Sequence, residues 1–464
     1  MQVTAGARLA LALLLGFAAT TAARAAVVTA PGYLAHTIPT PDVAQGGVVR
    51  RAGALLVGQG TFGPGSEYIV RLDRNGATVV ATGFNSLGGM DLEPDGTLLV
   101  VDNGAELPGA LTGDTLFEIR DALARTSALP AVGHEVLPPG TFPAAQDVLI
   151  IPETVVVTDA AGPGAGRVVQ VTEDGHTRDL LTGLDFLGGL AFLTGGTLVV
   201  ANLDGSFVGS LLLYDVYALR RTTRATGLSG AFAPVVDGDG TTLLLSGGVA
   251  DDGSGTVVAI APDGAVTERA RGFGFTTEMF FDAERDELLV LDAGTRAVTA
   301  ICGDGDADGV CDADDPCTSS RGVSGARLTI AAHGRRLRFS GGTAVEAAFD
   351  PAANGLGVLI EGGMGSVLDA TVPGGAAWRT SARGKRWTYR DRRGAASGIV
   401  AIDLRARSGM LLFDIAGRRG AEPSPVDLPL RASLVLDPGG IRRACGVATP
   451  TCTFRRGGSV LRCR

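Results

Sequence analysis

The stretch Leu87-Gly-Gly-Met-Asp-Leu-Glu-Pro-Asp-Gly-Thr-Leu-Leu-Val-Val-Asp-Asn103 recurs one hundred positions later as Leu187-Gly-Gly-Leu-Ala-Phe-Leu-Thr-Gly-Gly-Thr-Leu-Val-Val-Ala-Asn202. A weaker copy runs from Thr276 to Asp292. The two strong copies join a glycine-containing strand, through a turn, to an apolar strand that ends in a polar residue. Self-similarity at a fixed interval is typical of repeat architectures.

The apolar strand that closes this motif occurs six times in the first two thirds of the chain. The copies are Leu55 to Gln59, Leu98 to Asp102, Val155 to Asp159, Leu198 to Asn202, Leu243 to Gly247 and Leu288 to Asp292. Their starts lie 43, 57, 43, 45 and 45 residues apart, and units of about this length with several short strands are typical of propeller blades. The sequence therefore predicts an all-β fold with a six-bladed β-propeller over residues 38–301. An all-β sandwich is the alternative.

The longer interval between the second and third units leaves room for an insertion from Asp121 to Pro143. The insertion is rich in proline, and we expect a short helix over Leu116 to Arg125 where it begins.

The pattern GG(M/L)…DGTL(L/V)VVD in residues 38–301 resembles the superfamily of six-bladed propellers that includes NHL-repeat proteins and the senescence-marker-protein/gluconolactonase group. The resemblance implies a propeller scaffold. For a gluconolactonase-like member it also implies a divalent cation at the channel mouth, which activates water for lactone or ester hydrolysis. The acidic ligand that this group carries near its N-terminus has no clear match, because Gln45 and Gln59 lack its charge.

The polar strand ends provide a candidate channel site, because equivalent positions of successive blades lie in a ring. Glu278 adds a carboxylate where two sister repeats have Gly89 and Gly189. Carboxylates and amides gathered at one mouth are suited to a divalent cation. The alternative is that Asp and Asn end these strands because they make local side-chain turns. The candidate residues are Gln59, Asp102, Asn103, Asp159, Asn202, Asp204, Glu278 and Asp292.

A second candidate site lies in Cys302-Gly-Asp-Gly-Asp-Ala-Asp-Gly-Val-Cys-Asp-Ala-Asp-Asp-Pro-Cys317. Its alternating aspartates, the glycine at the sixth position and the later acidic residues have the spacing of oxygen ligands in a calcium loop. So many like charges would repel one another unless a cation lay among them. A solvated acidic linker is the alternative. The predicted cofactor is calcium, and the predicted ligands are Asp304, Asp306, Asp308, Val310, Asp312 and Asp315.

This linker, residues 302–320, departs from an EF-hand at Asp315, Cys311 and Pro316, the last of which disfavours the helix an EF-hand needs. It resembles a thrombospondin type 3 repeat more closely. That resemblance implies a disulfide-pinned, helix-poor calcium loop. Extracellular calcium modules bind at about 10⁻⁴–10⁻³ M, so such a loop would be filled outside a cell.

The N-terminus predicts export to the periplasm or the extracellular space. Arg8 precedes an apolar run from Leu9 to Ala19, and Ala23-Arg24-Ala25 fits a cleavage site, so residues 1–25 are interpreted as a signal peptide. A retained anchor is the alternative, and no later stretch is long enough to span a membrane.

The six cysteines, three in the linker and three near the C-terminus, fit an oxidising compartment. They allow 15 pairings, and we expect one bridge to join the two groups. Zinc is the competing use, but no C-x-x-C pair or nearby histidine supports it.

Residues 326–464 differ from the rest in charge. They hold 22 Arg/Lys against ten Asp/Glu, which leaves 18 against 39 for the remainder of the chain. Short alternating runs separated by Gly-Gly pairs predict a β-sandwich, in which Trp378, Trp387 and Tyr389 are core residues or a sugar-stacking platform. The basic charge suggests an anionic partner such as polysaccharide, lipid headgroup or nucleic acid. The alternative is that the arginines of this region lie on solvated strand faces and form salt bridges to the acidic domain.

Other chemistries find no support. The four histidines lack metal spacing, and neither a G-x-S-x-G elbow, a P-loop nor a nucleic-acid module is present, so no catalytic residue is named and nucleic acid is not an expected partner. We interpret the chain as an exported calcium-binding multidomain protein whose propeller binds a small molecule, glycan or protein. The alternative function is a metal-dependent lactone or ester hydrolase of gluconolactonase type.

Overall fold

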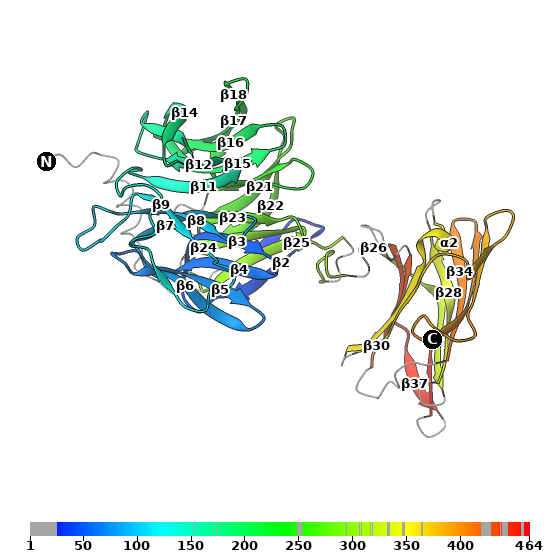
Figure 1. The fold of residues 1–464 in the computed structure, drawn as a ribbon. Coiled ribbons are helices and arrows are strands. Elements are labelled where there is room, and N and C mark those ends of the chain that lie inside the picture. The colour runs from blue at the N-terminus through cyan, green and yellow to red at the C-terminus, as the bar shows by residue number, and fades with distance from the viewer. Residues whose placement is uncertain are drawn as a thin grey trace. The chain divides into compact units, whose positions relative to one another are not determined.

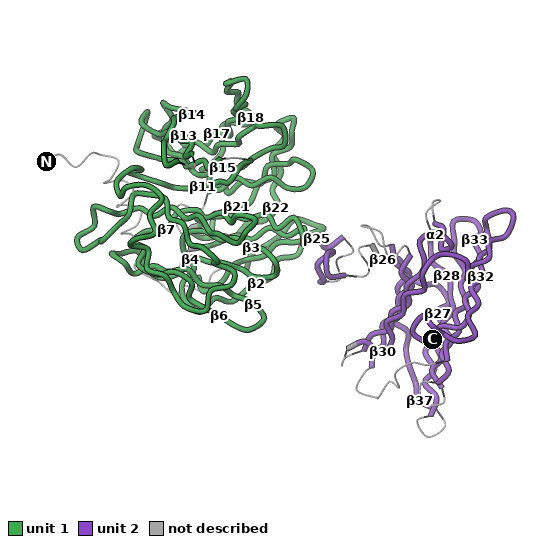
Figure 2. Tube along the Cα trace, viewed as in Figure 1, with its two compact units in different colours: residues 1–303 green, residues 304–464 purple. Residues whose placement is uncertain are grey.

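The computed structural model describes residues 26–464 apart from 153, 173, 248–252, 294, 306, 308, 316, 318, 332–334, 346–348, 363–364, 419–427, 437, 439–443 and 456–458. The predicted signal peptide, residues 1–25, lies outside the described residues. The chain divides into two compact units, Met1–Gly303 and Asp304–Arg464 (Figure 2). The division falls inside the predicted calcium linker.

The first unit consists of six antiparallel sheets. The first is β3 (Ala44–Arg51), β4 (Ala54–Gln59), β5 (Glu67–Asp73) and β6 (Gly76–Phe84), extended by the parallel β10 (Leu129–Pro130). The second is β7 (Ser86–Leu92), β8 (Leu98–Asn103) and β9 (Thr115–Ile119). The third is β11 (Ala145–Ile151), β12 (Thr154–Asp159), β13 (Gly166–Val171) and β14 (Thr177–Leu184).

The remaining three sheets repeat this plan. The fourth is β15 (Phe186–Leu193), β16 (Thr197–Leu203), β17 (Val208–Asp215) and β18 (Arg220–Ser229). The fifth is β19 (Phe232–Val236), β20 (Thr242–Ser246), β21 (Gly255–Ile260) and β22 (Val266–Phe273), with β1 (Val28–Thr29) at its edge. The sixth is β23 (Phe275–Asp282), β24 (Glu287–Ala293) and β25 (Ala297–Gly303), with β2 (Tyr33–Pro39) as its outer strand.

The first strands of the six sheets form a closed ring. Strands β3, β7, β11, β15, β19 and β23 each contact the next, and β23 contacts β3. Figure 1 labels these strands except β19. The unit is therefore a six-bladed β-propeller, as the repeat spacing predicts. Strand β2, from the N-terminal end, completes the sixth blade, so the propeller sheets include residues that precede position 38.

The second strand of each blade is apolar because both of its faces are buried. Leu56 of β4 packs into the core between the first and second blades, whereas Leu55 and Val57 pack against the sixth blade. Side chains of a strand alternate between its two faces, so a strand between two neighbouring blades needs an apolar run rather than alternation.

The expected helix over Leu116 to Arg125 is wrong. Strand β9 occupies Thr115–Ile119, and turns follow it. Phe117 and Ile119 enter the core between the first and second blades, while Leu116 enters the core that the second blade shares with the third. This alternation stabilises a strand in place of a helix.

The second unit contains two sheets. One has the order β26 (Ser319–Gly322), β36 (Ala444–Ala448), β35 (Arg431–Leu436), β29 (Leu356–Gly362) and β30 (Gly365–Val372). The other has the order β31 (Trp378–Thr380), β32 (Arg386–Arg390), β33 (Ile399–Arg407), β34 (Met410–Gly417), β28 (Arg336–Ala344), β27 (Ser324–Ala331), β38 (Val460–Cys463) and β37 (Cys452–Arg455). The short helix α2 (Pro351–Asn354) precedes β29.

One hydrophobic core joins the two sheets of this unit. Val358 and Leu434 enter it from the five-stranded sheet, and Phe339 enters it from the eight-stranded sheet. Trp378 and Trp387 are buried in the same core, so their rings are packing residues and not an exposed platform for sugar stacking.

Disulfides reinforce the second unit. Cys317 is bonded to Cys445 and Cys452 to Cys463, so the expected bridge between the linker and the C-terminal group is present. Cys302 and Cys311 are also disulfide-bonded. No helix within the described part of the chain is both long and apolar enough to cross a membrane.

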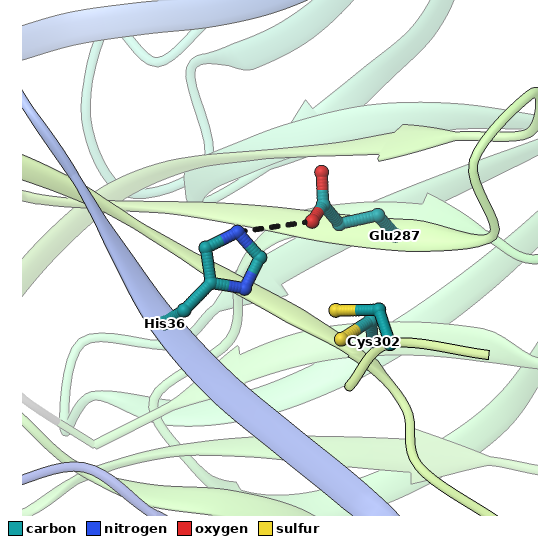
Figure 3. A group of neighbouring side chains, drawn as sticks. His36, Glu287 and Cys302 are labelled. Atoms are coloured by element: carbon teal, nitrogen blue, oxygen red, sulfur yellow. Dashed lines mark ion pairs between the residues drawn. The ribbon is translucent and has the colours of Figure 1, made fainter. Parts of the chain in front are cut away.

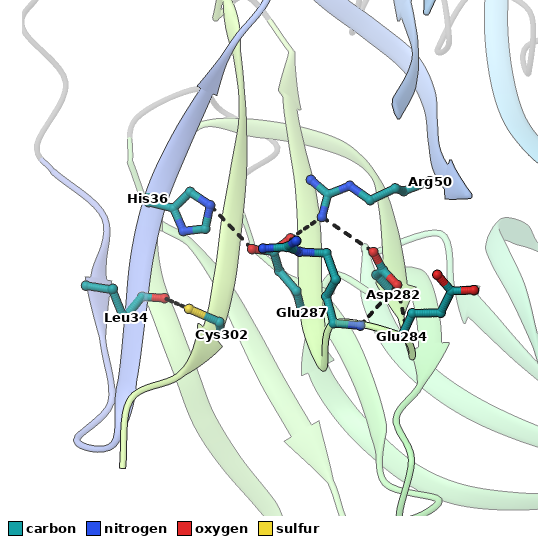
Figure 4. Close-up of polar contacts among 8 residues, drawn as sticks. Leu34, His36, Arg50, Asp282, Glu284, Glu287 and Cys302 are labelled. Atoms are coloured by element: carbon teal, nitrogen blue, oxygen red, sulfur yellow. Dashed lines mark hydrogen bonds and ion pairs between the residues drawn. The ribbon is translucent and has the colours of Figure 1, made fainter. Parts of the chain in front are cut away.

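A buried polar network lies where the last blade meets the first. His36 of β2 lies 3.3 Å from a carboxylate oxygen of Glu287 of β24 (Figure 3). Arg50 of β3 contacts Glu287 through the same nitrogen that lies 3.5 Å from Asp282 (Figure 4). The Glu287 side chain is 2% exposed and that of Arg50 is 12% exposed. The network therefore ties the closing strand and both end blades together.

We predict that Arg50→Met destabilises the propeller by about 3–5 kcal/mol, because it leaves Asp282 buried without its basic partner and removes the most buried of the basic groups around Glu287. Denaturant unfolding measures the change. Arg285→Met is the matched control: Arg285 lies 3.7 Å from the same glutamate but is 43% exposed, and its loss should cost less than about 1 kcal/mol. Equal costs for the two variants would contradict the role assigned to Arg50.

Candidate functional site

The start of the innermost strand is irregular in every blade. The pairing between the first and second strands shifts register there in all six sheets, as in Ala145/Asp147, Leu187/Gly189 and Thr276/Glu278. Register shifts of this kind re-aim side chains and are frequent next to functional sites. They place Asp147, Gly189 and Glu278 at equivalent positions, opposite Thr158, Ala201 and Leu291 of their partner strands.

Asp147 lies on β11, the inner strand of the third blade. Its side chain contacts the inner strands of the two neighbouring blades, β7 and β15. One oxygen accepts a hydrogen bond from the Val148 backbone at 2.8 Å, and the other accepts one from Leu190 of β15 at 2.7 Å. On the other side, a Cβ atom added to Gly89 of β7 would lie 2.0 Å from Oδ1 of Asp147. Because the carboxylate meets the inner strand on each side, it lies on the axial side of β11.

Two further carboxylates lie near Asp147. Glu278 belongs to the inner strand of the sixth blade, opposite the third in a ring of six, and accepts a hydrogen bond from the Met279 backbone at 3.1 Å. Asp91 of β7 accepts hydrogen bonds from Leu92 at 2.7 Å and from Ile150 of β11 at 2.8 Å. Asp147 is 6% exposed and Glu278 is 8% exposed.

Burial dominates the electrostatics of this group, which we call the axial carboxylates (Asp91, Asp147 and Glu278). Burial, with a smaller contribution from the charge of Asp91, raises the pKa of Asp147 to about 7, although the hydrogen bonds from Leu190 and Val148 act to lower it. The pKa of Glu278 is held well above its usual range by burial and then by the charges of Asp147 and Asp91. Within the described residues neither Asp147 nor Glu278 has an ion pair with a basic side chain. Only Asp91 has a favourable charge in range, from Arg51.

Glycine makes room for these side chains. A Cβ atom on Gly189 would lie 3.1 Å from Asp147 Oδ2 and the same distance from Pro234, and one on Gly89 would overlap the Asp147 carboxylate. The sister repeats carry glycine where the third and sixth blades carry acids. The two acids therefore occupy space that the glycines leave open.

The predicted channel residues occupy a second layer, at the ends of the second strands. Asp102 accepts hydrogen bonds from the backbone of Asn85 and Ser86, which lead into the second blade. In the same way Asp159 accepts one from Ala144, Asn202 from Asp185, and Asp292 from Gly274. These side chains hold the connection that enters each inner strand, which is the local turn role set out above as the alternative.

The other predicted channel residues differ among themselves. Asp204 accepts from the backbone of its own turn, and Asn103 donates its amide hydrogen to Ala145. The oxygen of Asn103 and both polar atoms of the Gln59 amide are buried without a hydrogen-bond partner among the described residues. Of the predicted set, Glu278 alone belongs to the axial carboxylates.

Two buried acids that the sequence analysis does not name, Glu67 and Asp114, lie beside Asp102 of this layer. Glu67 of β5 accepts hydrogen bonds from the Gln45 amide and the Leu87 backbone, and burial raises its pKa to about 8. Burial raises the pKa of Asp102 to about 7 and that of Asp114 to about 6. Carboxyl groups with pKa values raised in this way are frequent at functional sites.

In the linker, the described residues form a compact loop. The Gly309 backbone donates to Asp304 at 3.1 Å, and the Gly305 backbone donates to Asp312 at 3.0 Å. Gly309 has φ +85, which fits the sharp turn expected at that glycine. Asp304 and Asp315 are buried, and Val310 is 39% exposed.

Asp306 and Asp308 lie outside the described residues. Three of the predicted acidic ligands are thus placed in one loop with carboxylate chemistry that suits calcium.

Among the described residues, a different group is the one in which three or more donor atoms lie within 4.8 Å of one another, and its chemistry does not suit a metal. It includes His36, Glu287 and Cys302 (Figure 3). Cys302 is oxidised in a disulfide, and only a thiolate is an effective metal ligand. Glu287 is already paired with Arg50. This group is therefore assigned to closure of the propeller.

No protein-family model matches the sequence, and no curated protein matches it significantly. Similar solved structures include a gluconolactonase from Xanthomonas campestris, with 16% identity over 59% of this chain and 98% of that one, at a TM-score of 0.38. Regucalcin, a calcium-binding protein from Agrobacterium tumefaciens, shows 16% identity over 56% and 90%, at 0.40. A luciferin-regenerating enzyme shows 12% identity over 59% and 96%, at 0.44. At these values we take no function from the likeness, and the fold assignment follows from the chain's own strand pairing.

We predict that the propeller loses stability as pH rises from 4 to 7 in the presence of a chelator. Asp147 has a pKa raised to about 7 in the folded state, so its contribution is complete below the unfolded pKa near 4 and is lost as pH approaches 7. Asp147 alone should contribute about 2–4 kcal/mol to the fall in the free energy of unfolding across this window, and Asp147→Asn should remove that share and leave the shares of the other buried acids. Asp263→Asn, at an exposed turn, is the control. An unchanged pH profile in Asp147→Asn would contradict the assignment.

Proposed function

We propose that this chain is an exported calcium-binding multidomain protein whose propeller, a scaffold for a ligand or partner, holds a divalent cation on its axis. The ligands are Asp147 and Glu278, with Asp91 beside them. The observation that carries the proposal is the burial of these carboxylates together, with no ion pair from a basic side chain to Asp147 or Glu278 among the described residues.

The charge balance supports a cation. Buried carboxylates that face one another can avoid repulsion by taking up protons or by sharing a cation. Protons suffice at acidic pH, but near neutrality Asp147 approaches its pKa of about 7 and a cation becomes the favourable counter-charge.

The donor set indicates the kind of ion. Each carboxylate oxygen can accept more than one bond, so oxygens that already accept from Val148, Leu190 and Met279 keep capacity for a metal. All of the candidate ligand atoms are hard carboxylate oxygens, which suit Ca²⁺ or Mg²⁺ better than a thiophilic metal.

The linker is the second calcium site in this proposal. Its ligands are Asp304, Asp306, Asp308, Asp312 and Asp315 with the Val310 carbonyl, in the spacing of a calcium loop. The support is the burial of Asp304 and Asp315 and the backbone hydrogen bonds that fold the loop upon itself. An affinity of about 10⁻⁴–10⁻³ M would suit an extracellular module.

The cysteines support export. No cysteine is free, and disulfides persist in the periplasm and outside the cell, whereas cytosolic proteins rarely keep them. Both environments also supply calcium at the concentration that such a loop requires.

A metal-dependent lactone or ester hydrolase is the second candidate function. It is favoured by the amide of Gln59 and the side-chain oxygen of Asn103. These atoms are buried at the strand ends without a hydrogen-bond partner among the described residues, so they could bind a ligand. Asp114, with a pKa of about 6, is available there as a proton acceptor. A bound divalent cation would supply a water of lowered pKa.

Calcium titration calorimetry on the mature chain tests the two metal sites. We expect two classes of binding in the wild type, and the loss of one in Asp147→Asn/Glu278→Gln. Asp304→Asn/Asp315→Asn should lose the other. Asp263→Asn/Glu268→Gln is the matched control, since it makes the same chemical changes at exposed propeller positions. Unchanged stoichiometry in the axial variant would refute the axial site and leave the linker site standing.

A separate screen decides on the hydrolase. If that function is correct, a panel of lactones and aryl esters with millimolar calcium should reveal turnover, and Asp114→Asn should reduce it by about 10²-fold or more, as loss of a general base does. The exposed Asp263→Asn variant should retain full turnover. The absence of turnover on the whole panel, with the axial cation bound, would leave the binding function alone.

A further inference from the structure

The outer face of the eight-stranded sheet in residues 304–464 is unusually basic. Its inner face supplies Leu328, Phe339, Trp387, Leu404 and Phe413 to the core. Because side chains alternate along a strand, the residues between these positions share the opposite face, and their arginines are exposed. We call this surface the arginine face.

The arginine face carries ten arginines and two acidic residues. The acidic residues are Asp403 and Asp414. The arginines are Arg327, Arg336, Arg338, Arg379, Arg386, Arg390, Arg405, Arg407, Arg455 and Arg462.

The strand register aligns part of the face into a row. Arg390 is opposite Ala401, Ala401 opposite Ala416, and Ala416 opposite Arg338. The row continues through Thr329 to Arg462. With strands about 4.8 Å apart, these positions extend over on the order of 25 Å. An extended chain laid across the strands would meet arginines along its length.

Most of this charge is not neutralised within the sheet. Asp414 is paired with Arg338, and Asp403 is paired with Arg390 and Arg386. The remaining seven arginines of the face form no ion pair with a described residue of residues 304–464. Ion pairs within this unit therefore involve only three of the ten arginines.

One pair runs against the rules of sheet stability. Arg386 of β32 and Arg405 of β33 are directly opposite each other on the arginine face. Like charges directly opposite are destabilising in a sheet. Asp403 partly balances Arg386, at 3.7 Å, whereas Arg405 has no ion pair among the described residues of this unit. Positions that break a local rule are often functional, and an external anion would supply the counter-charge that Arg405 lacks.

We propose that the arginine face binds an extended anionic polysaccharide that carries carboxylate groups. Guanidinium groups are planar and donate two parallel hydrogen bonds to a carboxylate, whereas lysine acts as a point charge. The basic residues of the face are all arginine, as are all but one of the 40 Lys and Arg residues of the chain, so the cations that the face offers are all of this bidentate kind. Charge complementarity is thus combined with a geometry suited to uronate groups.

The face lacks the features that other polyanions require. Among the described residues of the face, Leu412 is the one large apolar side chain that is exposed, at 46%. The face therefore has little apolar area to insert into a membrane. The rings of Trp378, Trp387 and Tyr389 are buried in the core. No such ring is free to stack the bases of a single-stranded nucleic acid.

The test is binding of polygalacturonate to the full mature chain, measured by calorimetry in EDTA so that calcium cannot bridge the polymer to the acidic propeller. We expect Arg405→Thr/Arg407→Thr/Arg462→Thr to weaken binding by about tenfold or more. Raising the salt from about 0.05 to 0.5 M should also weaken it, because exposed charges are screened. The triple variant should unfold at the wild-type temperature or above, because it removes the Arg405 repulsion.

Arg178→Thr/Arg220→Thr/Arg221→Thr is the matched control, since it removes three exposed arginines from propeller strands. Its affinity should stay within about twofold of the wild type. An equal loss of affinity in both triple variants would show that binding depends only on net charge, and it would overturn the proposal. So would the absence of polygalacturonate binding, or equal or tighter binding to phosphatidylglycerol vesicles or to DNA.

Discussion

The close approach of the six inner strands around one axis is the constraint on which the propeller depends. Blades in a ring leave least room at their inner edge. A residue that faces the axis must therefore be small, or it must make an interaction that offsets the free-energy cost of burying its side chain. Gly89 and Gly189 satisfy this directly, since an added Cβ atom would meet the Asp147 carboxylate or its neighbours. The third and sixth blades depart from the rule with Asp147 and Glu278. A cation that those acids share would offset the cost of their burial.

The same constraint explains the second polar layer. Each inner strand is entered through a tight connection whose backbone N–H groups need partners. Asp102, Asp159, Asn202 and Asp292 provide them from the end of the adjacent strand. The repeated polar strand end is therefore chiefly a structural device, and the chemistry is concentrated where the repeats differ from one another.

Much of this fold is predictable from the sequence, because its signals are local. Regular intervals between apolar strands predict six blades, and alternation with cysteine placement predicts the strands and one bridge of the second unit. Both glycines are replaced in the third blade (Gln146, Asp147) and in the sixth (Thr277, Glu278). Glu278 is still recognisable from the sequence because Met279 follows it as Met90 follows Gly89, whereas for Asp147 only its pairing with Thr158 reveals the equivalence. The helix expected over Leu116 to Arg125 failed because neighbouring blades, distant in sequence, bury alternate side chains of that segment. The arginine face also depends on register, which composition alone cannot supply.

The most direct test of the axial cation is anomalous diffraction from crystals of the mature chain grown with Mn²⁺ as a substitute for calcium. A hard-oxygen site accepts manganese as well. The account predicts an anomalous peak between the carboxylates of Asp147 and Glu278, separate from any peak within the loop of Asp304 and Asp315. A peak in the loop with none at the axis, at a pH above 7, would contradict the central claim.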